Sequence, residues 1–166
     1  AIHDTRAAGL SATFDTRSSR LLMAYRSNIG RVLVQALNGT VFSPPVDTGI
    51  SSTSTPAIAC STLAGPSRNC IIAIWEATPP ASRLQWFEFG WNATTGTVDA
   101  GPLTTESLRL YGPPRLAARA SEFELQYVRS AAGGSSVVYT FAKPVGSGLF
   151  STFGGTTILG QTSGVG

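Results

Sequence analysis

The chain repeats itself at intervals of about 50 residues, and this repeat constrains its fold more than any other feature. The motif Val-Asp-x-Gly at residues 46–49 recurs at 98–101, a lag of 52 residues (98 − 46 = 52). The same lag relates Trp75 to Tyr127, while Tyr25 precedes Trp75 by 50 residues (75 − 25 = 50). A repeat of this length predicts an architecture in which copies of one supersecondary unit are stacked on each other.

Each repeat contains short apolar runs separated by turn residues, and the β-branched character of these runs favours strands over helices. Residues 70–75 are almost continuously apolar, as is typical of a strand that is buried on both faces. The sequence therefore predicts an all-β fold of three four-stranded antiparallel blades of a β-propeller. The expected strands are residues 11–14, 21–26, 31–37 and 46–49, then 56–60, 70–76, 83–89 and 96–101, then 114–117, 123–128, 136–141 and 150–153.

These runs predict blade boundaries near 1–52, 53–105 and 106–158, with 159–166 as a tail or the start of a further blade. Propellers close into rings of about four to eight blades. Three blades alone would leave two sheet faces and two sheet edges in water. We therefore expect the ring to be completed by a second copy, by another chain or by another segment of a longer polypeptide.

Composition excludes several classes of partner. Only 13% of the residues are charged, the net charge is +3, and no cluster of five or more Lys and Arg occurs, so we expect no nucleic-acid partner. No apolar run approaches the ~20 residues that a membrane-spanning helix needs, so we expect no membrane span. The chain begins with neither a Met nor a signal peptide, which predicts a start inside a longer precursor or after processing.

The two cysteines indicate an oxidising compartment. Cys60 and Cys70 flank a segment that contains the turn signal Gly65-Pro66, so a hairpin would place them opposite each other on neighbouring strands. A disulfide is favoured over two free thiols, and it predicts a secreted protein, extracellular or periplasmic. The only histidine is His3, far from this pair, so we expect no zinc site and no cofactor.

Three segments carry a resemblance to a known family: Ser-Thr-Pro-Ala-Ile-Ala at 54–59, Cys-Ile-Ile-Ala-Ile-Trp at 70–75, and Arg-Leu-Gln-Trp-Phe at 83–87. With them the chain resembles sialidase-like propellers of the bacterial neuraminidase repeat type, which are found in secreted bacterial proteins. The resemblance spans nearly the whole chain. Such folds include both glycosidases and binding modules without catalytic activity.

The family's Asp box, Ser-x-Asp-x-Gly-x-Thr-Trp, is absent from all three repeats. Catalytic sialidases also need three arginines that clamp a carboxylate, a tyrosine nucleophile with a nearby glutamate, and an acidic residue for proton transfer. No motif in this chain brings such residues together, so we assign no catalytic residue. The residue types themselves are supplied by Arg115, Arg119, Glu122 and Tyr127.

Candidate ligand contacts cluster in the second repeat, which holds all three tryptophans. Aromatic faces stack on sugar rings, but buried packing is the commoner role of Trp, and Trp75 aligns with Tyr25 and Tyr127. We therefore expect those three rings at equivalent, mostly buried positions. Trp91 follows Gly90 in a turn, so we expect it to be exposed. The candidate ligand-binding residues are Trp91, Trp86, Arg83 and Asn92.

These features predict a binding or interaction module that recognises carbohydrate or protein through loops at the mouth of the channel. The alternative is part of a sialidase-like glycoside hydrolase, whose active site would be completed by blades outside this chain. Asp47 and Asp99 begin the two Asp-x-Gly turns, and we expect them to accept hydrogen bonds from turn backbone rather than to bind a metal ion.

Overall fold

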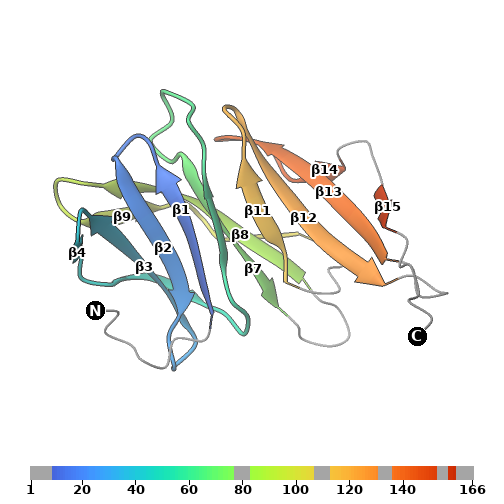
Figure 1. The fold of residues 1–166 in the computed structure, drawn as a ribbon, viewed down its shortest axis with the longest axis horizontal. Coiled ribbons are helices and arrows are strands. Elements are labelled where there is room, and N and C mark those ends of the chain that lie inside the picture. The colour runs from blue at the N-terminus through green and yellow to red at the C-terminus, as the bar shows by residue number, and fades with distance from the viewer. Residues whose placement is uncertain (1–8, 77–82, 107–112, 131–135, 153–156, 160–166) are drawn as a thin grey trace, which may run out of the picture.

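The computed structural model describes residues 9–76, 83–106, 113–130, 136–152 and 157–159. These residues form fifteen strands and no helix, so the expectation of an all-β fold is confirmed (Figure 1). Within this part of the chain, no helix is long and apolar enough to cross a membrane. The strands make three antiparallel sheets that follow one another along the chain, at residues 10–51, 57–106 and 115–159.

Each sheet is a meander whose third strand pairs with two short strands on its far side. The first sheet contains β1 (Leu10–Asp15), β2 (Arg20–Arg26), β3 (Arg31–Asn38), β4 (Val41–Phe42) and β5 (Val46–Ser51). The middle sheet contains β6 (Ala57–Cys60), β7 (Cys70–Glu76), β8 (Arg83–Asn92), β9 (Thr97–Ala100) and β10 (Thr104–Glu106). The third sheet contains β11 (Arg115–Ala118), β12 (Glu122–Ser130), β13 (Ser136–Pro144), β14 (Ser151–Thr152) and β15 (Thr157–Leu159).

The expectation of four strands in each sheet is therefore wrong, because the fourth position is divided. In the first sheet β4 and β5 both pair with β3, and Pro44 and Pro45 lie between them. In the middle sheet β9 and β10 both pair with β8, and Pro102 lies between them. Proline has no N–H to donate to a ladder, so it interrupts a strand where it occurs. The proposed blade boundaries stay a prediction, and residues 160–166 of the expected tail lie outside the described residues.

The sheets stack face to face in chain order, and the middle sheet is covered on both sides. Ile72 and Ile74 of β7 point toward the first sheet, where they pack in one core cluster with residues such as Leu22. Ile71 and Ala73 point the other way, into a second cluster that includes Phe123 of the third sheet. All four of these β7 side chains are fully buried. The continuous apolar run of β7 is explained by this double burial.

The first strands of successive sheets lie next to each other. The backbone N–H of Ile58 in β6 donates to Ser11 Oγ in β1, at 3.2 Å. On the other side of the middle sheet, Ser61 Oγ just after β6 donates to the carbonyl of Ala120, which lies between β11 and β12. Both sheet junctions are thus organised around their first strands.

The three aligned aromatic residues do not all occupy equivalent positions. Tyr25 is buried on the face of the first sheet that points away from the middle sheet, because its neighbours Leu22 and Ala24 belong to the first core cluster. Tyr127 is buried on the corresponding face of the third sheet, whereas Trp75 is only half-buried and lies on the opposite face of the middle sheet, in the same cluster as Tyr127. The expected burial is therefore confirmed for Tyr25 and Tyr127, and the expected register is wrong for Trp75. An odd difference in hairpin length moves a strand's side chains to the opposite face while leaving the lag of 52 residues intact.

The predicted disulfide is confirmed. Cys60 and Cys70 are bridged as directly opposite residues of β6 and β7, with a Cα–Cα distance of 4.0 Å. The bridge closes the loop of residues 61–69, which reaches toward the first sheet. Ser61 N donates to the carbonyl of Asn69 at 2.7 Å and reinforces the same closure.

Replacement of both cysteines by alanine should lower the free energy of unfolding by about 2–3 kcal/mol, because the unfolded chain regains the entropy of a short loop. Urea unfolding followed by tryptophan fluorescence measures the change. The Thr62→Ala variant, at an exposed position inside the same loop, is the control and should unfold like the parent. Equal stability of the parent and the double variant would contradict this role.

Candidate functional site

A hollow of about 430 Å³ opens where the first and middle sheets meet, and we refer to it as the junction hollow. The turn between β1 and β2 forms one side of it. The loop before β7, the end of β8 and part of β9 form the other side. Its lining combines both signs of charge, two hydroxyl groups and an indole ring: Arg17, Ser18, Ser67, Gly90, Trp91, Asn92, Ala93 and Asp99.

The turn that carries Arg17 and Ser18 is held by Asp15. This buried carboxylate accepts hydrogen bonds from the backbone N–H groups of Arg17, at 3.1 Å, and of Ser18, at 3.3 Å. It also accepts from Ser18 Oγ and, at 2.8 Å, from the side-chain amide of Asn69 in the middle sheet. An Asp that caps the turn after its own strand is a common local arrangement. Here the same carboxylate also fixes the turn against the next sheet.

Arg17 crosses the junction and holds the opposite loop. Its Nη1 donates to the carbonyl oxygens of Pro66 and Ser67, the latter at 3.1 Å. This loop in turn lies so close to β8 that a Cβ atom on Gly90 would stand 2.2 Å from the Ser67 oxygen. Glycine is therefore required at position 90 for steric reasons. The loop that forms this wall of the junction hollow is therefore held by Arg17 on one side and packed against β8 on the other.

The structure brings Trp91 and Asn92 into the junction hollow, as the sequence suggested, but the expected exposure of Trp91 is wrong. Trp91 is only 9% exposed, because most of its ring belongs to the core between the first and middle sheets. Asn92 is exposed, and its Oδ1 accepts the N–H groups of Thr94 and Thr95 at 3.0 and 3.2 Å. The role of both residues in ligand binding stays a prediction.

The two Val-Asp-x-Gly motifs carry matched ion pairs, but one lines the junction hollow and the other does not. Asp99 pairs with Arg68 at 3.0 Å, and Asp47 pairs with Arg31 at 3.1 Å. Asp47 Oδ1 also accepts the N–H of Gly49, which lowers the pKa of Asp47 below its usual value, and the Arg31 guanidinium acts in the same direction. The predicted turn-capping role is thus observed for Asp47, while Asp99 is one of the residues that line the junction hollow.

A smaller hollow of about 180 Å³ lies at the junction of the middle and third sheets. Arg68 of the middle sheet borders it, as Arg17 of the first sheet borders the larger one. The loop after β13 closes it from the third sheet. The lining residues are Arg68, Trp86, Glu88, Gly101, Pro102, Thr104, Gly146, Ser147 and Gly148.

A buried ion pair joins the two sheets beside this second hollow. Lys143 of β13 is 1% exposed, and its ammonium group donates to Glu88 of β8 and to the carbonyls of Pro144, at 2.9 Å, and Ser147, at 2.8 Å. Glu88 also accepts the N–H of Gly146 at 3.0 Å. All three ammonium hydrogens have acceptors, which is the condition under which a buried charge is tolerated.

The remaining candidates from the sequence lie elsewhere. Trp86 is buried beside the second hollow, where its Nε1 donates to Glu106 and Lys143 Nζ lies 4.6 Å from its ring centroid. Arg83 is exposed at the start of β8, eight residues from Trp91, which corresponds to roughly 26 Å along a strand. It borders neither hollow. Arg17, Ser67 and Arg68 were missed, because their approach to the site depends on contacts between sheets that no local pattern reveals.

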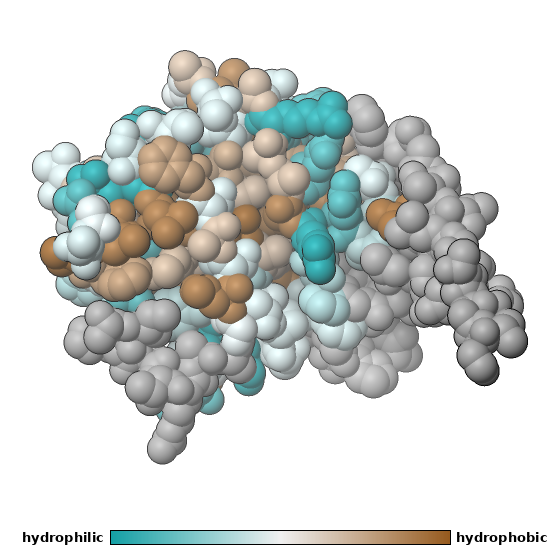
Figure 2. Space-filling view, viewed as in Figure 1, coloured by the Kyte–Doolittle hydropathy of each residue, from teal (hydrophilic) through white to brown (hydrophobic). Residues whose placement is uncertain are grey.

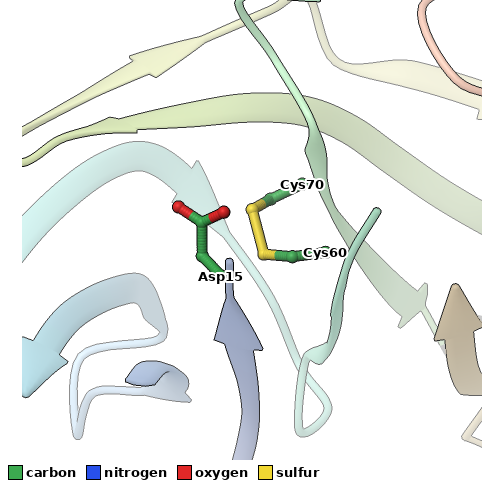
Figure 3. A group of neighbouring side chains, drawn as sticks. All are labelled: Asp15, Cys60 and Cys70. Atoms are coloured by element: carbon green, nitrogen blue, oxygen red, sulfur yellow. A yellow bond between two sulfur atoms is a disulfide. The ribbon is translucent and has the colours of Figure 1, made fainter. Parts of the chain in front are cut away.

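One group of side chains in the described part of the chain has the spacing of metal ligands: Asp15, Cys60 and Cys70 (Figure 3). The two sulfurs are joined in the disulfide and therefore offer no thiolate to a metal ion. The oxygens of Asp15 already accept the four hydrogen bonds described above. In this oxidised form the group is a structural contact between the first and middle sheets.

Comparisons with known proteins identify no family for this chain. No family model matches the chain, and no curated protein does so either. Among solved structures, the chain is similar to a fucose lectin from Kordia zhangzhouensis, determined in complex with methyl-fucoside. The TM-score is 0.48 and the sequence identity is 12%, over 90% of this chain and 100% of the lectin chain. Similarity at this level assigns neither a family nor a ligand to the chain.

Replacement of Lys143 by methionine should lower the free energy of unfolding by about 3–5 kcal/mol, because Glu88 would stay buried without its counter-ion. The double variant Lys143→Met with Glu88→Gln should recover at least half of this loss, since the amide oxygen still accepts from Gly146 N. Urea unfolding measures both. The exposed pair gives the control: Arg31→Ala should cost less than about 1 kcal/mol. A Lys143→Met variant as stable as Arg31→Ala would disprove the importance of this pair.

Proposed function

We propose that the chain is a carbohydrate-binding module and that the junction hollow is its ligand site. The observation that carries this proposal is the lining of the hollow. Charged groups of both signs, hydroxyl groups and an indole ring surround one space of about 430 Å³. That volume falls within the range of about 300–1,000 Å³ that is usual for small-molecule sites.

The chemistry of this lining suits a sugar better than an apolar or purely ionic ligand. Sugar hydroxyl groups both donate and accept hydrogen bonds, so they can be met by a carboxylate acceptor such as Asp99 and by hydroxyl groups such as those of Ser18 and Ser67. The C–H face of a sugar ring packs against an aromatic surface, and the small part of Trp91 that the core leaves uncovered is at the wall of the hollow. Opposite charges at Arg17 and Asp99 do not favour a ligand of either sign.

The site is also held in place before any ligand arrives. Trp91 is fixed by the core beneath it, Ser67 by Arg17 and by its close approach to Gly90, and the β1–β2 turn by Asp15. Fixed groups lose little conformational entropy when a ligand binds, which matters for sugars because their individual contacts are weak. Rigid walls thus support a recognition role.

We also propose an architecture and a cellular location for the chain. We infer that the three stacked sheets are blades of a β-propeller of the sialidase-like type, completed by a partner outside this chain. Support comes from the repeat, from the meander in each sheet and from the neighbouring first strands. The disulfide supports a secreted protein, because such bridges persist in oxidising compartments.

The alternative from the sequence, part of a sialidase-like glycoside hydrolase, makes a different prediction. A hydrolase of this kind would turn over a fluorogenic sialoside once its ring is complete, whereas a binding module would bind sugars without turnover. Among its candidate residues, the exposed Arg119 is paired with the buried Glu124, and Tyr127 is buried in the core between the middle and third sheets. We therefore give preference to the binding module.

Replacement of Asp99 by alanine should weaken sugar binding by about tenfold, the loss expected when one hydrogen bond to a charged group is removed. A glycan array identifies the sugars that are bound, and titration calorimetry with the methyl glycoside of the strongest binder measures the affinity. Asp47→Ala is the matched control, because it removes an equivalent exposed ion pair from the other Val-Asp-x-Gly motif.

The Asp47→Ala variant should bind as the parent does. Equal losses in the two variants would show that the effect on binding is indirect. An array with no bound glycan would refute the proposed function, and hydrolysis of the fluorogenic sialoside would favour the alternative.

A further inference from the structure

The middle sheet shows how a first strand is buried when a sheet lies on each side of it. Ala57, Ile58 and Ala59 of β6 are all 7% exposed or less. Ile58 belongs to the cluster shared with the first sheet, and Ala59 belongs to the cluster shared with the third. Alternate residues of β6 are therefore covered by different neighbours. The first strands of the two outer sheets can be judged against this reference.

In β1 the residues that point away from the middle sheet have no such cover. Leu10 is 49% exposed and Phe14 is 55% exposed, with the exposed Ala12 between them. Figure 2 shows hydrophobic residues gathered on the surface over β1 and β2. On the neighbouring strand β2 the same face of the sheet is covered, since Met23 and Tyr25 are buried. The open apolar stripe thus lies at the first strand, where sheets of this chain approach each other most closely.

In β11, too, one face is covered by the middle sheet and the other face is exposed, but here the exposed face points away from the C-terminal side of the middle sheet. Leu116 and Ala118 pack in the cluster shared with the middle sheet, whereas Arg115 and Ala117 on the other face are exposed. The small side chain of Ala117 resembles Ala57 and Ala59, which lie where neighbouring first strands pass each other. Within the described residues, the outer face of the first strand of the third sheet therefore lacks the cover that β6 has.

We propose that the outer face of β1 docks on the outer face of β11 of a second copy of this chain, head to tail, so that two copies complete one ring of six sheets. This inference rests on the blade architecture included in the proposed function. Its partner is specified by the stacking order. Within the chain, the face of one sheet that points toward the next sheet (its following face) packs on the face of that next sheet that points back (its preceding face). The outer side of β1 belongs to a preceding face and the outer side of β11 belongs to a following face, so β11 of a second copy can pack on β1 in the same order.

Two other arrangements fit less well. Two copies joined through their β1 strands would pair two preceding faces, a combination that neither junction of the chain uses. An open head-to-tail chain of copies would bury the same surfaces but would grow into a filament. A ring of two copies leaves no first strand uncovered, and burial of the Leu10 and Phe14 side chains would contribute to its stability through the hydrophobic effect.

Thiol cross-linking distinguishes these arrangements. Both native cysteines are bridged, so a cysteine introduced at Ala12 or Ala117 provides the only free thiol for a short bismaleimide reagent. The double variant Ala12→Cys, Ala117→Cys should give a covalent dimer on a denaturing gel. Neither single variant should do so. Dimer formation by Ala12→Cys alone would show that two β1 strands face each other and would overturn the head-to-tail arrangement.

Light scattering of the parent gives the oligomeric state independently. The expected mass is twice 17.3 kDa, and a well-folded monomer of 17.3 kDa would refute the proposal. Replacement of Phe14 by aspartate should convert the dimer to a monomer with unchanged far-ultraviolet circular dichroism. Val41→Asp is the control, because Val41 is an apolar residue of the same sheet, at least as exposed as Phe14, that lies outside the β1 stripe. A Phe14→Asp variant that remains a dimer would also refute the proposal.

These outcomes are separate from those that test sugar binding. The junction hollow lies between the first and middle sheets of one chain, so a monomer could still bind the glycoside. A parent chain that is a monomer and still binds the glycoside would reject the ring alone. A dimer that binds no sugar would reject the ligand site while leaving the assembly intact.

Discussion

The packing of two sheets against opposite faces of β7 is the constraint on which the rest of the structure depends. A single small sheet exposes two apolar faces and cannot be stable alone, so each repeat needs a neighbour. In the middle sheet this need is met twice, with Ile72 and Ile74 on one side and Ile71 and Ala73 on the other. Each hollow is lined by residues of two adjacent sheets, so both depend on these contacts.

Much of this fold could be predicted from the sequence, because strands and hairpins are encoded locally. The run from Cys70 to Trp75 predicts a doubly buried strand, and the Gly65-Pro66 turn between two cysteines predicts a bridged hairpin. Both predictions are confirmed. The division of the fourth strand was missed, although Pro102 indicates it. The pattern of apolar runs was given more weight than the missing N–H group.

The face on which each residue lies could not be predicted in the same way. A lag of 52 residues aligns Trp75 with Tyr127, yet the two rings come from opposite sheets into one cluster. A change of one residue in the register of a strand moves all its side chains to the opposite face, and the lag between repeats does not reveal such a change. The site shows the same limit. Trp91 and Asn92 are neighbours in the chain and were found together, whereas Arg17 reaches them only through the stacking of the first sheet.

The burial of Lys143 has a consequence for the chemistry of the protein surface. It is the single lysine of the chain, and its ammonium group is enclosed between two sheets by Glu88 and two carbonyl oxygens. All other basic side chains apart from His3 are arginines, whose delocalised guanidinium groups are not amine nucleophiles. Reducing sugars modify proteins slowly by condensing with side-chain amines. The folded surface presents no lysine for that reaction, so prolonged contact with aldehyde-bearing sugars should leave its side-chain positive charge intact.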